Sequence, residues 1–192
     1  MATQDSRIKI KRSTVSGTVP TVAPSDDHTQ PSPAWTATDI YKGELFINQA
    51  DNVIWSRGDD GVFCIGGTAE LTIASADVLT LNSTPLTIVS AVSGYAIEVV
   101  SASVKLDFNT TAYGTTTAIL LKTTGASNRQ AEAVVLDATV STVRNFTTFQ
   151  ATAATDVQMI TNADLTVEAK SNNPTTGDSD VTVYVNYRLI PA

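Results

Sequence analysis

The sequence predicts an all-β fold in which a C-terminal antiparallel β-sandwich or jelly roll follows an extended N-terminal arm and a small β-meander. Threonine, whose β-branched side chain suits a pleated sheet, supplies 30 of the 192 residues. Short β-branched segments recur at intervals of roughly 8–15 residues after residue 70, as expected of a sandwich. No window shows a 3.6-residue apolar period over the length of a helix.

Residues 1–39 are predicted to form an extended arm and a proline-containing linker. Residues 1–12 carry a net charge of +3, whereas the remaining 180 residues carry −10. The basic residues between Arg7 and Arg12 alternate with Ile8 and Ile10, which favours a strand that pairs with a partner; the alternative is a basic arm that docks on an acidic surface. Four prolines between residues 20 and 33 favour an extended linker or a segment that becomes ordered on a partner.

Residues 40–69 are predicted to form a meander of three short strands. The strands are expected at residues 44–48, 53–57 and 62–65, because turn-forming sequences separate these apolar segments. A meander of this size is not stable alone, so we expect it to pack on the next domain or on copies of itself. Gly66 and Gly67 are expected to form a hinge between the domains.

Residues 70–192 are predicted to form the β-sandwich domain. In the last expected strand, the odd-numbered residues from Val181 to Leu189 are apolar and should face the core, and the even-numbered residues from Thr182 to Arg188 should face the other way. The expected strands are residues 71–75, 78–81, 85–90, 95–107, 117–124, 131–138, 142–150, 156–161, 164–170 and 180–190.

The composition argues against most enzyme, metal and membrane functions. One cysteine, Cys64, cannot form an internal disulfide or complete a thiolate zinc site, and one histidine, His28, leaves few His-based mechanisms. No apolar segment has the length of a membrane span or a signal sequence, so we expect no membrane insertion and no cleaved signal. The basic arm lacks aromatic residues and the rest of the chain is acidic, so nucleic-acid binding is not expected.

The remaining motifs have ordinary structural explanations. Arg57-Gly58-Asp59 matches an integrin-type tripeptide, but these residues are also common in turns. Asp178 and Asp180 offer oxygen ligands for Ca²⁺, but their spacing does not match an EF-hand loop and favours a turn. Cys64 is expected to be buried as a small apolar residue, and Trp55 to be the packing anchor of a hairpin. No spacing singles out a carboxylate pair, so no catalytic residue, cofactor or metal is assigned and no enzyme is expected.

The scarcity of charge has two explanations that the sequence leaves open. Charged residues make up 16% of the chain, and threonine takes the place of the usual lysine and glutamate on the predicted wet strand faces. Neighbouring subunits would favour such a surface, because burying an unpaired charge is costly. A compositional bias of an extracellular or viral lineage is the other explanation. Edge strands protected by few charges favour assembly over a monomer.

Two regions of the chain resemble structural proteins of tailed-bacteriophage particles. Residues 8–14 (IKIKRST) and 43–57 (GELFINQADNVIWSR) are similar to an N-terminal module of fibre and tropism-determinant proteins, which has a basic strand, a proline-containing linker, G-E-L-x-I-N and an aspartate turn. Asn52 stands where that module usually has glycine, and the linker is longer than in the module. Residues 96–100 (AIEVV), 173–180 (NPTTGDSD) and 183–190 (VYVNYRLI) resemble a β-sandwich domain of phage virion proteins.

The resemblance implies a structural component of the virion, assembled in the host bacterial cytoplasm. It implies a homotrimeric head fibre, tail fibre or capsid decoration protein that is anchored to the particle by its N-terminal segment. The expected partners are other virion proteins of the capsid, collar or tail and further copies of the chain. The residues expected to anchor it are those of the basic strand, Arg7, Ile8, Lys9, Ile10, Lys11 and Arg12.

The alternative function is a receptor-binding module of a phage tail. Two loops, residues 109–117 and 172–180, are rich in Asn, Thr and Tyr, which suits a polar ligand such as a host cell-surface glycan. The same residue types are ordinary in turns. The side chains expected to face a receptor are Asn109, Tyr113, Asn172, Asn173 and Asp178.

Overall fold

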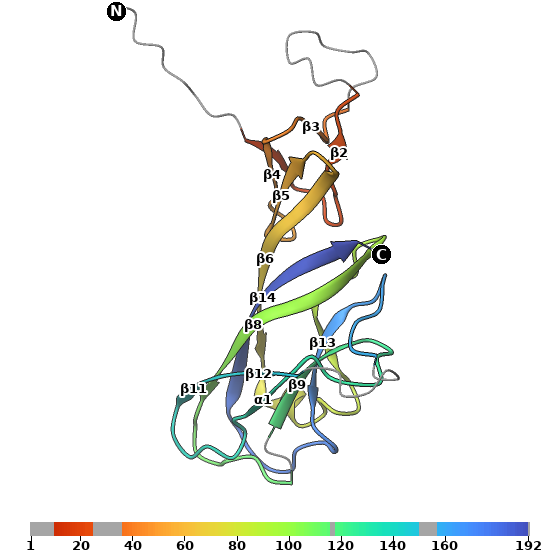
Figure 1. Ribbon diagram of the computed structural model, residues 1–192. Helices are drawn as coiled ribbons and strands as arrows, with labels where there is room; N and C mark the ends of the chain where they lie inside the picture. The colour runs from red at the N-terminus through yellow and green to blue at the C-terminus, as the bar shows by residue number, and fades with distance from the viewer. Residues whose placement is uncertain (1–9, 25–35, 116–117, 150–156, 192) are drawn as a thin grey trace, which may run out of the picture. The chain divides into compact units, whose positions relative to one another are not determined.

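The computed structural model describes residues 10–24, 36–115, 118–149 and 157–191, and it confirms the predicted all-β sandwich fold. The chain divides into two compact units, residues 1–66 and 67–192 (Figure 1). Strand β6 (Gly61–Ile73) begins in the first unit and ends in the second. Gly66 and Gly67 therefore lie inside a continuous strand, where the sequence predicted a hinge.

The first unit joins the predicted arm and the predicted meander. Strand β1 pairs in parallel with β4, β4 pairs antiparallel with β5, and β5 lies beside the first part of β6. Strands β2 and β3 form a separate parallel pair. Of the predicted arm, β1 thus occupies the edge of the meander, while β2 belongs to the separate pair. The strands are β1 (Lys11–Ser13), β2 (Thr21–Val22), β3 (Asp39–Ile40), β4 (Leu45–Asn48) and β5 (Val53–Gly58).

One face of the β4–β5 hairpin forms the core of the first unit. Phe46 pairs with Trp55 across the two strands, and each side chain is 1% exposed. Trp55 is confirmed as the packing anchor that the sequence predicted. The turn between the strands contains Asn52 at φ 53°, a left-handed conformation that asparagine tolerates better than most residues. This conformation is compatible with asparagine at a position where the module described above usually has glycine.

The second unit consists of two antiparallel sheets. One sheet has the strand order β6-β14-β8-β11 within this unit, and the other has the order β12-β10-β9-β13-β7. The long strands β8 and β14 pair along their lengths (Figure 1). The elements are α1 (Ser75–Val78), β7 (Leu86–Val89), β8 (Tyr95–Asp107), β9 (Ala118–Thr123), β10 (Ala131–Val134), β11 (Thr142–Asn145), β12 (Thr147–Thr148), β13 (Leu165–Ala169) and β14 (Asp180–Pro191).

The core of the second unit lies on the inward faces of these strands. The predicted alternation of β14 holds for the odd-numbered residues from Val181 to Leu189, which are all buried, whereas Thr182 among the even-numbered residues is buried as well. Ile119, Leu165 and Val167 are fully buried on the opposing sheet. Gly67 allows a close approach in this core, because a Cβ atom there would lie 2.6 Å from Cζ of Tyr187. The glycine at the expected hinge thus makes room for an aromatic ring.

Several of the predicted strands differ in the structure. Residues 62–65 and 71–73 belong to one strand, β6, and the expected strand 131–138 ends at Val134 as β10. Residues 78–81 are not a strand: helix α1 and a turn place Val78 and Leu81, three residues apart, in the core, a spacing that suits a helical turn. The expected strand 142–150 divides into β11 and β12, because Phe146 between them is buried and the chain changes sheets there. Residues 157–161 form no strand.

Candidate functional site

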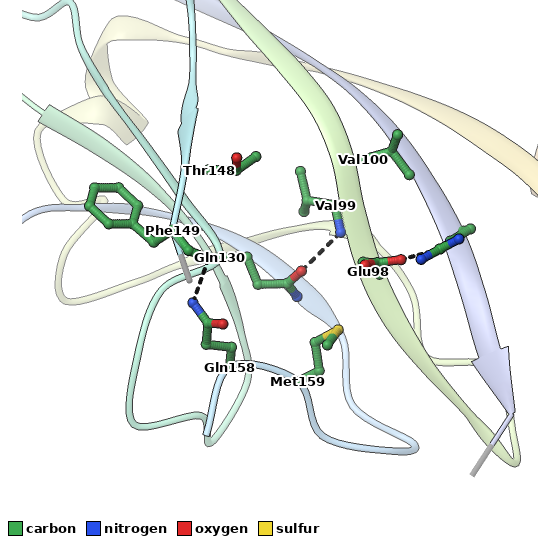
Figure 2. Close-up of a pocket in the computed structure, with 9 residues that line it drawn as sticks. Glu98, Val99, Val100, Gln130, Thr148, Phe149, Gln158 and Met159 are labelled. Carbon is green, nitrogen blue, oxygen red and sulfur yellow. Dashed lines mark hydrogen bonds and ion pairs between the residues drawn. The ribbon is translucent and has the colours of Figure 1, made fainter. Parts of the chain in front are cut away.

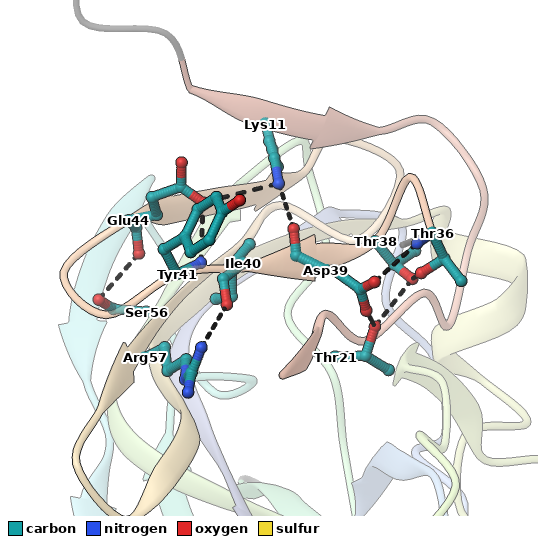
Figure 3. Close-up of polar contacts among 10 residues, drawn as sticks. All are labelled: Lys11, Thr21, Thr36, Thr38, Asp39, Ile40, Tyr41, Glu44, Ser56 and Arg57. Carbon is teal, nitrogen blue, oxygen red and sulfur yellow. Dashed lines mark hydrogen bonds and ion pairs between the residues drawn. The ribbon is translucent and has the colours of Figure 1, made fainter. Parts of the chain in front are cut away.

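Of the predicted anchoring residues that the structure describes, Lys11 makes contacts within the first unit, and Ile10 and Arg12 are exposed. The Lys11 ammonium donates a hydrogen bond to the Asp39 carbonyl oxygen, lies 3.6 Å from the Glu44 carboxylate and sits 5.6 Å from the centre of the Tyr41 ring (Figure 3). Arg12 and Ile10 are exposed. Lys11 thus holds β1 to the rest of its own unit. Residues Arg7, Ile8 and Lys9 lie outside the described residues, and the anchoring role stays a prediction.

A buried carboxylate, that of Asp39, organises the start of β3. It accepts hydrogen bonds from the Thr21 hydroxyl at 2.5 Å and from the Thr36 backbone N–H at 2.6 Å (Figure 3). Burial alone would raise the pKa of Asp39, but the hydrogen bonds from Thr21 and Thr36 and the charge of Lys11 hold that pKa below its usual value. The ionised carboxylate therefore binds β2 to the residues preceding β3.

Asn48 and Asp51, both within the motif that resembles phage proteins, form a second polar cluster. Asn48 is 1% exposed, and its amide nitrogen donates to the Val15 and Thr18 carbonyl oxygens, each at 3.1 Å, and to Asp51 at 2.6 Å. Asp51 also accepts from the Gly17 backbone N–H at 2.7 Å. These contacts tie the loop after β1 to the β4–β5 turn. The motif residues thus build the first unit itself.

Outside its core, the first unit carries exposed apolar side chains. Ile10, Leu45, Ile54, Phe63 and Ile65 are 43%, 38%, 39%, 49% and 52% exposed. Strand alternation sets Leu45 and Ile54 on the face opposite the buried pair of the hairpin, and Phe63 and Ile65 share one face of β6. We call these five residues the apolar face. Clustered apolar residues that remain exposed typically mark a surface for another molecule.

The two loops predicted to face a receptor are brought together by Asp178. Its carboxylate accepts from the backbone N–H groups of Thr110 at 3.1 Å and Thr111 at 2.9 Å, and from the side-chain amide of Asn109 at 3.1 Å. The hydrogen bonds from Thr110 and Thr111 hold the pKa of Asp178 below its usual value. Two of the predicted receptor-facing side chains, Asn109 and Asp178, therefore bond to each other.

The other three predicted residues have different environments. Tyr113 is 4% exposed, and its hydroxyl donates to the Ser179 carbonyl oxygen at 2.5 Å, so it does not face outward. Asn173 accepts hydrogen bonds from the backbone N–H groups of Asn82 and Ser83, at 2.9 and 3.0 Å. Asn172 is exposed. The loops are adjacent as a receptor site requires, but most of the polar groups named for that site hold the loops together.

The outer face of the second unit contains a β-bulge that the sequence analysis missed. Asn186 of β14 pairs with Ser101 and Tyr187 pairs with Val99, which leaves Val100 of β8 without a ladder partner and 57% exposed. The buried positions of β8 change from odd to even numbers at the bulge. Ile97 and Val99 are buried before it, and Ala102, Val104 and Leu106 are buried after it. Bulges often redirect side chains next to binding sites.

Two depressions meet at this bulge, and we call them together the bulge groove. One, of about 380 Å³, is bordered by Glu98, Phe149, Gln158 and Met159 (Figure 2). The other, of about 460 Å³, is bordered by serine, asparagine and tyrosine side chains of β8, β11 and β14. Val100 and Thr148 line both. Beneath them, the buried amide of Gln130 accepts from the Val99 backbone N–H at 2.9 Å.

The minor motifs have structural roles. Arg57 donates to the Ile40 carbonyl oxygen at 3.2 Å, and Asp59 lies 2.9 Å from the Lys42 ammonium, so both charges of the tripeptide have partners within the first unit. Asp180 accepts from the Ser75 backbone N–H at 2.9 Å. Cys64 is half-buried instead of fully buried, because it lies on a strand of which one face is open.

The described residues contain neither a metal-binding cluster nor a membrane-spanning helix. No group of three or more His, Cys, Asp or Glu side chains in the described ranges is placed to hold a metal ion. Within the same ranges, no helix has the length and apolar character needed to cross a membrane.

Comparison with known proteins finds similarity to a chain of a phage capsid structure. No protein-family model matches the chain, and no curated protein matches it. Among solved structures, the chain is similar to a chain of the cyanophage Pam1 capsid asymmetric unit, with 19% sequence identity and a TM-score of 0.39. The similarity covers 66% of this chain and 86% of that chain. Similarity at this level assigns no function.

Proposed function

We propose that this protein is a non-enzymatic structural component of a bacteriophage particle, a homotrimeric fibre or decoration protein held on the virion by its N-terminal segment. The observation that carries the proposal is the apolar face of the first unit. Its five side chains are each about 40–50% exposed, and burying the exposed parts contributes about 1 kcal/mol per residue, or about 5 kcal/mol per chain. Contact between copies removes this surface from water.

The residues of the phage-like motif support the same proposal. Asn48 and Asp51 fix the loop after β1, and Lys11 fixes β1 itself, so the motif builds a small folded module that presents the apolar face. Residues 1–9 precede this module and carry Arg7 and Lys9. In this arrangement, the module joins the copies, and the basic residues before it contact other virion proteins.

The oligomeric state tests the role of the apolar face. The wild-type protein should have three times the chain mass of 20.2 kDa in sedimentation equilibrium. The double variant Phe63→Ser/Ile65→Ser should have the mass of a single chain, with its far-UV circular dichroism unchanged. Val143→Ser is the matched control, because Val143 is 64% exposed on the second unit. A monomeric wild type, or a trimeric double variant, contradicts the proposal.

A truncation tests the anchoring. A chain that starts after residue 9 should fold and form trimers but should not join particles when it replaces the full chain during infection. Incorporation at the wild-type level would rule out anchoring by the removed residues. Removing residues 1–39 is a poorer experiment, because it deletes β1 and the carbonyl acceptors of Asn48 and so disrupts the first unit.

The receptor-binding alternative stays a prediction at the two loops of the second unit. Asn109 and Asp178 bond to each other there, and Asn173 bonds to the backbone of a neighbouring loop. Asn172 is exposed, and a receptor role at these loops rests mainly on this residue.

A further inference from the structure

The bulge groove has the bonding capacity of a binding site for a polar ligand. Within the described residues, the hydroxyls of Tyr184 and Ser103 and the amide of Asn145 make no hydrogen bond, and all three border one depression. Each of these groups is able to donate and to accept a hydrogen bond. The Asn186 amide donates to the Ser101 hydroxyl at 2.9 Å, which orients a further pair along the same wall.

The groove also offers aromatic and apolar surface beside these polar groups. Tyr184 is 38% exposed, and Val100 is exposed at the bulge where the two depressions meet. The Phe149 ring borders the other depression (Figure 2). The Arg129 guanidinium lies 3.9 Å from the centre of this ring. Apolar contact area with a few placed polar groups is the usual composition of a small-ligand site.

The charges of the groove cancel. Glu98 and Arg188 form an ion pair with each other, and the second depression has no charged side chain among its lining residues. The chain as a whole carries −7, which disfavours a polyanionic ligand. An apolar peptide or a lipid would leave the hydroxyls and amides without partners at a cost in affinity. The remaining class is a ligand with many hydroxyl groups and no net charge.

The floor of the groove is fixed before any ligand binds. Gln130 is 6% exposed, and its amide nitrogen donates to the Ile97 carbonyl oxygen and to the Thr123 hydroxyl, each at 2.8 Å. With the hydrogen bond from Val99, these contacts link the bulged strand β8 to β9 of the other sheet. A preorganised site binds with a smaller loss of conformational entropy.

We propose that the bulge groove binds an uncharged oligosaccharide. A sugar ring packs against Tyr184, and its hydroxyls bond to Ser103 and Asn145, while the chain of sugars continues past Val100 toward Glu98. This binding does not depend on the assembly proposed above, because the groove is built from residues of one chain. The location also differs from the loops in which the sequence placed a receptor site.

An array of neutral and acidic oligosaccharides, probed with the labelled full-length protein, tests the proposal. We expect neutral members to bind, and titration calorimetry with the strongest of them should give at least tenfold weaker binding for Tyr184→Ala and for Asn145→Ala. Tyr184→Phe, which keeps the ring, should lose less affinity than Tyr184→Ala. Asn172→Ala is the matched control, because Asn172 is exposed on the loop of the alternative receptor site, and this variant should bind like the wild type.

Four outcomes of the binding experiments overturn the proposal. They are binding of acidic members alone, no binding of any neutral member, wild-type affinity in Tyr184→Ala, and loss of affinity in Asn172→Ala. Sedimentation of Tyr184→Ala provides a further check. A change in oligomeric mass would assign this face to contact between copies of the chain and would also overturn oligosaccharide binding here. An unchanged mass together with weakened binding supports oligosaccharide binding in the groove, whether or not the protein is a trimer.

Discussion

Replacing Asn48 with alanine should destabilise the first unit by about 2–3 kcal/mol. The substitution removes the donor to the Thr18 carbonyl oxygen and the acceptor of the backbone N–H groups of Ala50 and Asp51. A buried polar group left without a partner costs about 1–3 kcal/mol. Val15 adds little, because its carbonyl oxygen still accepts from the Thr18 hydroxyl at 2.7 Å. The expected loss is therefore that of one carbonyl and two partly exposed N–H groups.

Tryptophan fluorescence during urea unfolding measures this effect. Trp55 is buried in the first unit and reports its unfolding, while far-UV circular dichroism reports both units; Trp35 lies outside the described residues and is replaced by Phe in every protein of the series. Asn48→Asp should be more destabilising than Asn48→Ala, because it places a carboxylate against Asp51 and carbonyl oxygens. Asn172→Ala should match the wild type. A loss below about 0.5 kcal/mol for Asn48→Ala would refute the reasoning, because it lies below the cost of one orphaned buried group.

Three further predictions concern backbone conformation, packing and pH. Asn52→Val should cost about 1–2 kcal/mol and Asn52→Gly less than about 0.5 kcal/mol, measured by tryptophan fluorescence, because φ is 53°. Gly67→Ala should cost about 1–3 kcal/mol in thermal unfolding, because its Cβ would meet the buried Tyr187 ring, whereas Gly58→Ala should be tolerated, since its Cβ would lie 3.5 Å from the nearest atom. Burial raises the pKa of Tyr113 to about 12, so the folded state keeps a proton that the unfolded state loses, and stability should fall as the pH rises from about 10 to about 12. Tyr113→Phe should remove this part of the pH dependence of the urea midpoint, and an unchanged alkaline slope would contradict it.

Period-two alternation allowed much of the second unit to be predicted. Strand β14 follows the predicted alternation, and strand β8 has the predicted limits, because a buried face of Val, Ile and Leu dominates both. The segment at residues 78–81 was too short for its period to be read, and a helical turn explains Val78 and Leu81 equally well. The bulge at Val100 left a readable signal, the shift of the buried positions from odd to even numbers after Val99.

The polar clusters were beyond prediction from one sequence. Asn48 bonds to residues 30 and 33 positions away, and Asp178 bonds to a loop nearly 70 positions away. Local sequence patterns do not predict such pairings, because they form only when the fold brings distant segments together. The same limit applies to the candidate sites, since the loops at residues 109–117 and 172–180 were expected to present polar groups that in fact bond to one another.

The position of β14 has a consequence for synthesis of the protein. This strand, the last in the described chain, lies between β6 and β8, so the sheet of the second unit that contains these three strands cannot assemble fully until residue 191 has left the ribosome. At roughly 5–20 residues per second, the apolar strand β8 waits several seconds for its neighbour. The first unit, by contrast, is complete in the chain much earlier. Nascent chains that are interrupted before residue 180 should therefore leave the apolar face of β8 without its neighbouring strand and be prone to aggregation.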